Sequence, residues 1–239
     1  MSDTPRLTRR ATLAGAATLP LLAGTAQAAA PMLGAGTPMF NRFTMGDYEV
    51  TTLLAGTRTV PDPQTIFGMN VSGDEFAAVS AEAKIPTDAA QFFFTPTVVN
   101  TGAELILFDT GLSPDSITGA LAAAGYTPDQ VDVVVITHMH GDHIGGLMGD
   151  GGATFPNARY FVQRLEWADA IVPNERTRAT YLPDNYLPIL EQGRYTLLNG
   201  STSITNQVRT AVSRGHTRAH QVVILEDGDH TAVFVADLS

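Results

Sequence analysis

VDVVVITHMHGDHIGG, residues 131–146, is the most informative stretch of this 239-residue chain. Its first part, residues 131–136, is apolar and β-branched, which predicts a buried strand. Its second part brings together four potential metal ligands: His138, His140, Asp142 and His143. The glycine at position 141 lets the backbone turn between them without a side-chain clash. The stretch therefore predicts a metal site at the carboxyl end of a buried strand.

The spacing of these four side chains favours two metal ions over one. His138 and His140 are two residues apart, so in an extended segment they point the same way. Imidazole and carboxylate ligands together suit zinc or a similar first-row divalent metal. Four adjacent side chains cannot all reach one tetrahedral ion without strain, so we expect His138 and His140 on one ion, and Asp142 and His143 on another. The alternative, a solvated polar loop, is disfavoured by so many ligands directly after a strand.

Composition excludes several classes of function. The chain has 24 acidic and 14 basic residues, a net charge of −10, and no basic run that would contact phosphates, which argues against nucleic-acid binding. It has no cysteine, so disulfides, Cys-ligated zinc, a catalytic thiol and a lipoprotein anchor are all excluded. No Gly-x-Ser-x-Gly motif indicates a serine nucleophile. The length fits one sizeable domain or two small ones.

The first 28 residues have the three regions of a signal peptide. Arg9 and Arg10 belong to a positive region, residues 11–24 are apolar and small, and Ala26-Gln27-Ala28 is a cleavage site of the A-x-A type. The arginine pair resembles a bacterial twin-arginine signal. An uncleaved anchor is the alternative, but the apolar run is shorter than the ~20 residues that span a bilayer. We expect a periplasmic or secreted domain over residues 29–239, with no membrane anchor after cleavage.

The rest of the chain alternates strand and helix patterns. Strands are expected at residues 43–45, 48–54, 92–99, 105–108, 159–162, 208–212, 222–225 and 232–235, and helices at 74–84, 115–124, 144–148 and 165–171. Strand 105–108, helix 115–124 and the strand before His138 form a βαβ-like crossover, which places the ligands where sites in α/β sheets tend to lie. Trp167 is expected in the core. Residues 174–192 are irregular and interrupted by proline, which is compatible with a flap.

Further polar residues follow other predicted strands. Asp109 either caps its loop or orients a ligand imidazole by a hydrogen bond without binding the metal itself. A zinc site needs at least three protein ligands, so His216 is the expected third ligand beside His138 and His140. Asp237 has two oxygens with which to bridge two ions. His220 is expected behind the ligands or along the pocket, and the histidine at position 230 on the surface.

The motifs occur in the order seen in the metallo-β-lactamase-fold hydrolases. They are Phe108-Asp109-Thr110-Gly111, residues 137–146, Gly215-His216-Thr217 and Val235-Ala236-Asp237. Residues 45–51 and 124–132 make the chain most similar to the branch that contains methyl parathion hydrolase and the N-acyl homoserine lactonases. The resemblance implies an α/β fold, an αββα sandwich, with a site for two divalent ions, expected to be zinc, between its two sheets.

The resemblance also implies a role for each site residue. His138, His140 and His216 would hold the first ion, Asp142 and His143 the second, and Asp237 would bridge them. Asp109 would contact a ligand imidazole without binding metal itself. Two departures are visible. Arg218-Ala219 replaces the Pro-Gly that often lies between the two histidines of this motif. The chain stops at Ser239, so we expect the C-terminal part of the fold, with one further histidine ligand, to be missing.

The function implied is hydrolysis by a metal-bound hydroxide, shared by two ions ~3.5–4 Å apart. Asp142 and Asp237 would be the catalytic carboxylates, and the substrate a small lactone, aryl ester or organophosphate triester. One alternative is a mononuclear-iron oxygenase of the same fold that acts on sulfur compounds. Another is an inactive, truncated remnant that binds one metal ion or none. A homodimer is compatible with all three.

Overall fold

The structure is a computed structural model that describes residues 36, 38–175 and 177–238. The chain divides into two compact units, Met1–Gly36 and Thr37–Ser239, and the description below concerns the second. The predicted signal peptide, residues 1–28, lies outside the described residues. Among the residues that are described, no helix is both long and apolar enough for a membrane span.

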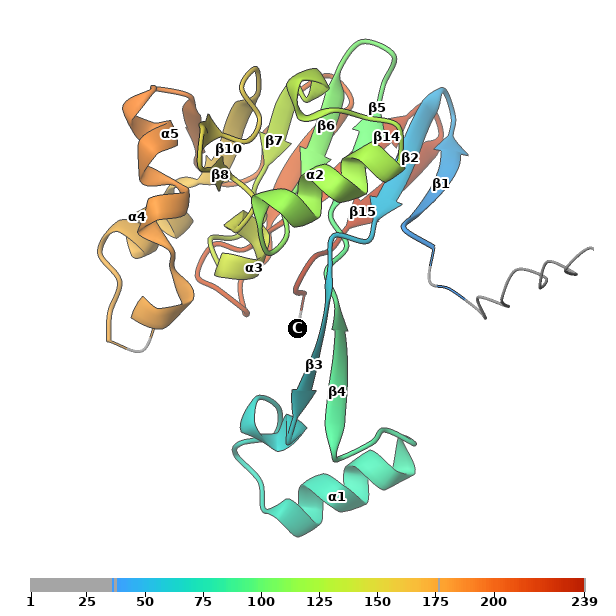
Figure 1. The fold of residues 1–239 in the computed structure, drawn as a ribbon, viewed down its shortest axis with the longest axis vertical. Helices are drawn as coiled ribbons and strands as arrows, with labels where there is room; N and C mark the ends of the chain where they lie inside the picture. The colour runs from blue at the N-terminus through green and yellow to red at the C-terminus, as the bar shows by residue number, and fades with distance from the viewer. Residues whose placement is uncertain (1–35, 37, 176, 239) are drawn as a thin grey trace, which may run out of the picture. The chain divides into compact units, whose positions relative to one another are not determined.

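The larger sheet has seven strands in the order β1-β2-β5-β6-β7-β10-β11 (Figure 1). The four from β1 to β6 are antiparallel neighbours, and those from β6 to β11 are parallel. The strands are β1 (Phe40–Met45), β2 (Tyr48–Leu53), β5 (Thr97–Asn100), β6 (Leu105–Phe108), β7 (Val133–Val135), β10 (Arg159–Gln163) and β11 (Tyr195–Leu198). The parallel pairing of β6 with β7 around helix α2 (Pro114–Ala123) confirms the predicted crossover. Strand β11 was not predicted.

The smaller sheet has four antiparallel strands in sequence order. They are β12 (Thr202–Ser203), β13 (Val208–Val212), β14 (Gln221–Asp227) and β15 (His230–Phe234). The two sheets share one apolar core, in which Ile106 and Phe108 of β6 meet Val223 and Leu225 of β14. Successive side chains of a strand point to opposite faces, so the other residues of β6 pack in a second core with the helices.

The helices lie over the outer face of the larger sheet. Helices α2, α4 (Arg164–Ile171) and α5 (Leu187–Glu191) contribute to the second apolar core. Trp167 of α4 is only 6% exposed and belongs to this core, as predicted. Ser113 caps α2 through a capping box with Ser116, directly before a proline at the first helical position. The mixed α/β sandwich inferred from the sequence is therefore present.

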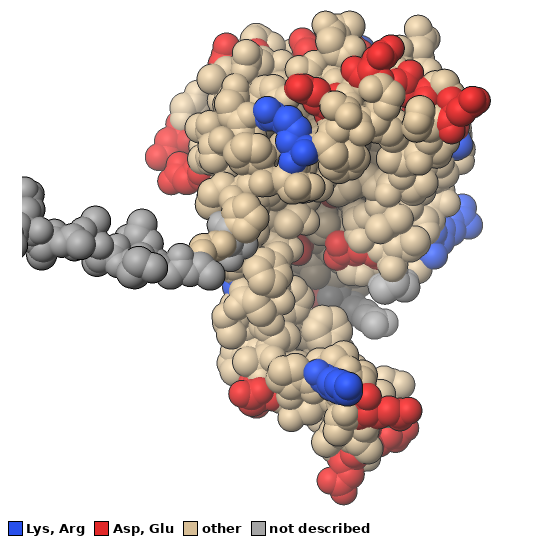
Figure 2. Space-filling model, turned by 90° about the vertical axis from the view of Figure 1, so that its right-hand side faces the viewer, with Lys and Arg blue, Asp and Glu red and all other residues tan. Residues whose placement is uncertain are grey.

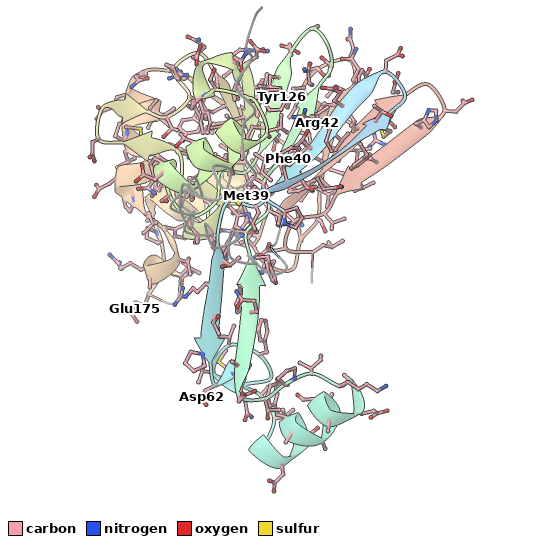
Figure 3. All side chains as sticks on the ribbon, turned by 45° about the vertical axis from the view of Figure 1, so that its right-hand side comes forward. Met39, Phe40, Arg42, Asp62, Tyr126 and Glu175 are labelled. Atoms are coloured by element: carbon pink, nitrogen blue, oxygen red, sulfur yellow. The ribbon has the colours of Figure 1, made fainter. Side chains whose placement is uncertain are left out.

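Strand β1 at the sheet edge is held to the end of α2 by Arg42. Its guanidinium lies over the rings of Phe40 (5.4 Å) and Tyr126 (5.0 Å), and Nη2 donates to the carbonyl of Ala124 at 2.5 Å (Figure 3). A guanidinium that stacks on aromatic rings and also donates a hydrogen bond covers part of an otherwise open edge.

An arm of two strands projects from the sheets (Figure 1). Strands β3 (Thr57–Pro61) and β4 (Ala89–Phe93) are antiparallel, and between them lie the 3-10 helix η1 (Pro63–Thr65) and helix α1 (Gly73–Glu82). Ser72 caps α1 by accepting from the amide of Glu75 at 3.2 Å. The arm carries exposed apolar side chains, namely Ile66, Phe67, Met69, Val79, Ile85 and Phe93. Acidic side chains are also visible at its end (Figure 2).

Two element predictions were wrong at their boundaries. A single strand at 92–99 was expected, but β4 and β5 are separate, because Pro96 between them has no amide to donate to a ladder. A helix was expected at 144–148, but α3 spans Gly141–Ile144, and residues 148–149 form β8 (Met148–Gly149) with β9 (Gly152–Ala153). The glycines after α3 serve close packing: a Cβ at Gly145 would lie 2.2 Å from the carbonyl oxygen of Leu112.

The predicted flap is more ordered than an open loop. Its described residues form the 3-10 helices η3 (Arg178–Thr180) and η4 (Pro183–Asn185), followed by α5. Tyr181, Tyr186 and Ile189 are buried in the core. Another 3-10 helix, η2 (Pro128–Gln130), leads from α2 into β7.

Candidate metal centre

The loop after β7 carries most of the predicted ligands. His138 and His140 lie in the extended segment that follows β7, and His140 is the N-cap of α3, which contains Asp142 and His143. The loop is fastened to the end of the neighbouring strand β6, because the amide of Thr110 donates to the carbonyl of His143 at 2.8 Å. The ligands therefore lie at the carboxyl ends of two parallel strands, as the sequence indicated.

Three imidazoles form the first group. His138, His140 and His216 each offer a nitrogen within 4.8 Å of the others. Nε2 of His216 lies 3.1 Å from Nδ1 of His140, and the rings of His138 and His216 are edge-on with centroids 4.7 Å apart. His216 comes from the loop between β13 and β14, so this group joins the two sheets. Three converging nitrogens are a typical zinc ligand set.

A second group shares His138 with the first. His138, His143 and Asp237 also offer ligand atoms within 4.8 Å of one another. Oδ1 of Asp237 lies 3.3 Å from Nε2 of His143, and Oδ2 lies 3.4 Å from Nε2 of His216. Each carboxylate oxygen thus faces a different group, which is the placement that a bridging ligand requires. The hydrogen bond from His143 lowers the pKa of Asp237.

Asp142 lies at the rim of the second group. Its Oδ2 is 3.8 Å from Nε2 of His143, and its side chain is 39% exposed. It belongs to neither three-residue group. The structure therefore brings five of the six predicted ligands together and leaves Asp142 beside them.

Asp109 holds His143 in one orientation. Its Oδ2 lies 2.8 Å from Nδ1 of His143 and accepts from Oγ1 of Thr137 at 2.7 Å, while Oδ1 accepts from the Thr137 amide at 2.8 Å. Asp109 is buried and has a left-handed φ of 58°, an unfavourable conformation that packing must maintain. With Nδ1 engaged, Nε2 of His143 points toward Asp237. Burial lowers the pKa of His143, but Asp109 more than offsets this and the pKa rises to about 10.

The donor atoms suit a divalent metal. Nδ1 of His138 pairs with Oγ1 of Thr137 at 3.2 Å, and the buried Nε2 has no hydrogen-bond partner in the described part of the chain. Burial and the neighbouring imidazoles lower the pKa of His138, and burial lowers the pKa of His140 to about 4. Neutral imidazoles with free lone pairs are the form that binds metal. A buried polar atom without a partner also requires an explanation, and a metal ion supplies one.

His220 lies next to these groups without joining either. It is fully buried, its ring centroid is 5.3 Å from that of His138, and neither ring nitrogen has a hydrogen-bond partner among the described residues. Burial lowers its pKa. His230 is exposed on β15, as predicted.

Two buried side chains behind the loops were not singled out from the sequence. Gln221 donates through Nε2 to the carbonyl of Ile136 at 2.7 Å, and Glu166 accepts from the amide of Met139 at 3.3 Å. Each has its partner far away in the sequence, and an isolated Glu in a helix is typical of a solvated face. No local pattern marks either residue.

An apolar cavity opens beside the ligand groups. Its volume is about 560 Å³. Along its wall His140, Gly141 and Asp142 face a set of mostly apolar residues that includes Val60, Ile66, Phe92, Phe94, Leu112 and Leu182. A second cavity of about 440 Å³ lies against Asp109, His143 and Asp237, and Asp142 lines this cavity too.

Comparison with known proteins places this geometry in a family. Residues 95–239 match the Metallo-beta-lactamase superfamily. The N-acyl homoserine lactonase AiiA of Bacillus thuringiensis subsp. kurstaki is 30% identical over 112 residues, 47% of this chain and 40% of that protein. The N-acyl homoserine lactonase AttM of Rhizobium johnstonii is 32% identical over 106 residues, 41% of this chain and 37% of that protein. The matched region spans about two fifths of these relatives.

Solved structures show the same fold. The hydrolase AbOPH of the beta lactamase superfamily superposes with a TM-score of 0.73 at 25% identity, covering 85% of this chain and 75% of that one. AidC, a dizinc quorum-quenching lactonase, superposes with a TM-score of 0.74 at 20% identity, covering 85% of this chain and 76% of that one.

Proposed function

This chain belongs to the metallo-β-lactamase superfamily, and from that premise we propose that it is a metal-dependent hydrolase of lactones, aryl esters or organophosphate triesters. One observation carries the proposal. The two three-residue groups share His138, and the two oxygens of Asp237 face His143 on one side and His216 on the other. Such an arrangement fits two ions a short distance apart.

Zinc is the metal that we propose, because imidazole nitrogens and carboxylate oxygens are its usual ligands. His138, His140 and His216 would hold one ion. Asp142 and His143 would hold the other, with Asp237 between them. When bound, the two ions supply a Lewis acid that lowers the pKa of a water molecule toward neutrality.

The two carboxylates would have different roles. Asp237 would fix the spacing of the two groups, because each of its oxygens faces a different one. Asp142 is partly exposed and lines both cavities, so it lies where an ester would approach the ligands. From that position its carboxylate accepts a hydrogen bond from water or carries a proton to the leaving oxygen.

The apolar cavity supports a substrate with an apolar substituent. An acyl chain or aryl ring against Phe92, Phe94 and Leu182 would leave the ester group beside His140 and Asp142. The relatives AiiA and AttM are named as N-acyl homoserine lactonases, and an N-acyl homoserine lactone carries such an acyl chain. The second ligand group favours the two-ion hydrolase over a one-iron oxygenase and over a remnant that binds no metal.

The test is hydrolysis by zinc-loaded protein of three probes: a p-nitrophenyl ester, an N-acyl homoserine lactone and an aryl phosphate triester. We expect at least one to be hydrolysed, and the rate to fall by more than about 100-fold on chelation or in His138→Ala, which removes a ligand of the first ion. The control His230→Ala alters an exposed histidine and should retain the parent rate. Hydrolysis that persists in metal-free protein and in His138→Ala would overturn the proposal.

A further inference from the structure

Glu166 is a fully buried carboxylate in α4. Burying a charged group is costly unless hydrogen bonds compensate, so each donor that faces it is informative. Burial raises the pKa of Glu166, whereas its hydrogen bonds lower it. The helix itself packs on the larger sheet, outside the ligand groups.

The donors to Glu166 come from both ligand loops. Oε2 accepts from the amide of Met139 at 3.3 Å, and Oε1 accepts from the amide of Ala219 at 2.9 Å and from the hydroxyl of Thr217. Met139 lies between His138 and His140, Thr217 follows His216, and Ala219 precedes His220. The three residues that one carboxylate contacts are therefore sequence neighbours of four histidines.

The two loops belong to different sheets, so their relative position is not set by strand pairing. The loop with Met139 follows β7 of the larger sheet, and the loop with Thr217 joins β13 to β14 of the smaller one. Apolar packing between the sheets is non-directional, whereas a charge-assisted hydrogen bond fixes position. The amide of Gln221 donates to the carbonyl of Thr137 at 3.0 Å and joins the loops at their base. Glu166 joins them at Met139, which lies between His138 and His140, and at Ala219.

We propose that Glu166 is a positioning residue that holds His140 and His216, on opposite loops, at the spacing that the first metal ion requires. The inference rests on the proposed function only in that these histidines bind metal. Glu166 belongs to neither three-residue ligand group, so any effect it has on metal binding acts through the loops. Residues that orient metal ligands typically contribute 10–100-fold to metal affinity.

The same helix provides a matched control. Asp169 pairs with Arg218 of the same loop at 2.6 Å, but the guanidinium side chain is 67% exposed. An exposed ion pair contributes little to stability. Asp169→Asn therefore removes an ion pair between the same helix and loop without disturbing the ligand spacing.

The experiment measures Zn²⁺ affinity by chelator competition and the visible spectrum of Co²⁺-loaded protein. Glu166→Gln keeps the size of the side chain but directs an amide donor at one of the loop donors, so at least one contact is lost. We expect about 10–100-fold weaker binding at the first site and a weaker, shifted tetrahedral cobalt band. Far-UV circular dichroism and cooperative unfolding should be retained, and Asp169→Asn should match the parent in affinity and spectrum.

A purely structural role predicts a different result. If Glu166→Gln unfolds more easily but binds zinc and cobalt like the parent, the inference is overturned. Should that variant fail to fold, Thr217→Val removes one donor while preserving shape, and we expect several-fold weaker zinc binding; unchanged binding overturns the inference. A parent that binds zinc but hydrolyses no probe contradicts the proposed function alone.

Discussion

Nδ1 of His143 lies 2.8 Å from Oδ2 of Asp109, and this contact determines which nitrogen of His143 faces Asp237. Because Asp109 is itself fixed by two hydrogen bonds from Thr137, the ring has little freedom to turn. The second ligand group therefore depends on a residue that is not one of its members.

Replacing Asp109 by Asn should weaken zinc binding at the second group. The variant loses the charge that orients and polarises His143, and we expect about 10–100-fold lower affinity after correction for proton competition. Metal titration with a competing chelator gives this value. Asp115→Asn removes a carboxylate on α2, away from the ligands, and should leave the affinity unchanged; an equal loss there would point to a general charge effect.

Metal uptake should release a proton from His143. Its pKa in the metal-free protein is about 10, so the ring is protonated at pH 7, and zinc requires it neutral. Affinity should therefore rise about tenfold per pH unit from neutrality to about pH 10 and then level off. Calorimetry in two buffers of different ionisation enthalpy counts the protons. The stability of the metal-free protein should change with pH in the opposite direction to its metal affinity. The raised pKa of His143 contributes folding stability that is fully present below the ordinary histidine pKa of about 6.5 and is lost as the pH rises through about 10.

Alanine substitutions at His216 and His220 should change the number of bound metal ions differently. His216→Ala should lose the first ion and keep the second, because Asp142, His143 and Asp237 remain. His220→Ala should keep both, since His220 lies outside both groups. Elemental analysis of purified protein measures the stoichiometry. If His220→Ala loses as much metal as His216→Ala, then the ligands are wrongly assigned.

Gly145 should not tolerate a side chain. A Cβ there would meet the carbonyl oxygen of Leu112 at 2.2 Å, so Gly145→Ala must displace backbone and should destabilise the fold by about 2–4 kcal/mol. Chemical denaturation measures the free energy of unfolding. Gly119→Ala, inside α2 with nothing within 4 Å of the new Cβ, should instead stabilise by up to about 1 kcal/mol. A Gly145→Ala variant as stable as the parent would show that the contact relaxes freely.

Export remains a prediction from Arg9-Arg10 and Ala26-Gln27-Ala28. We expect the protein recovered from the periplasm to begin at Ala29, and a variant with Lys at both arginine positions to stay unprocessed in the cytoplasm. Intact-mass spectrometry distinguishes the two forms. Recovery of the uncleaved Met1 form alone from the periplasm would reject the cleavage site.

Local patterns predicted the parts of the fold that depend on neighbouring residues. The apolar run at residues 105–108, the caps of α2 and the ligand spacing after Val135 each involve only a few consecutive residues. The crossover and the first ligand loop could therefore be predicted from the sequence. His216 and Asp237 were inferred because a metal site needs more ligands than one loop supplies. Glu166 could not be inferred, because its partners Met139 and Ala219 lie 27 and 53 residues away.

The division between β4 and β5 depends on tertiary structure in the same way. Residues 92–99 look like one apolar strand, yet the first half pairs with β3 of the arm and the second with β2 and β6 of the larger sheet. Sequence periodicity reports that a segment is extended, but it does not report which neighbour the segment pairs with.

The ligands are spread over about 100 residues, from His138 to Asp237, and this has a consequence during synthesis. At about 5–20 residues per second, a ribosome takes roughly 5–20 s to travel between them. During that interval the chain has only part of the ligand set, and His138, His140 and His143 are available to the divalent ions that imidazole prefers. We therefore expect the metal content of the folded protein to depend on whether ions bound early exchange once Asp237 has been added to the chain.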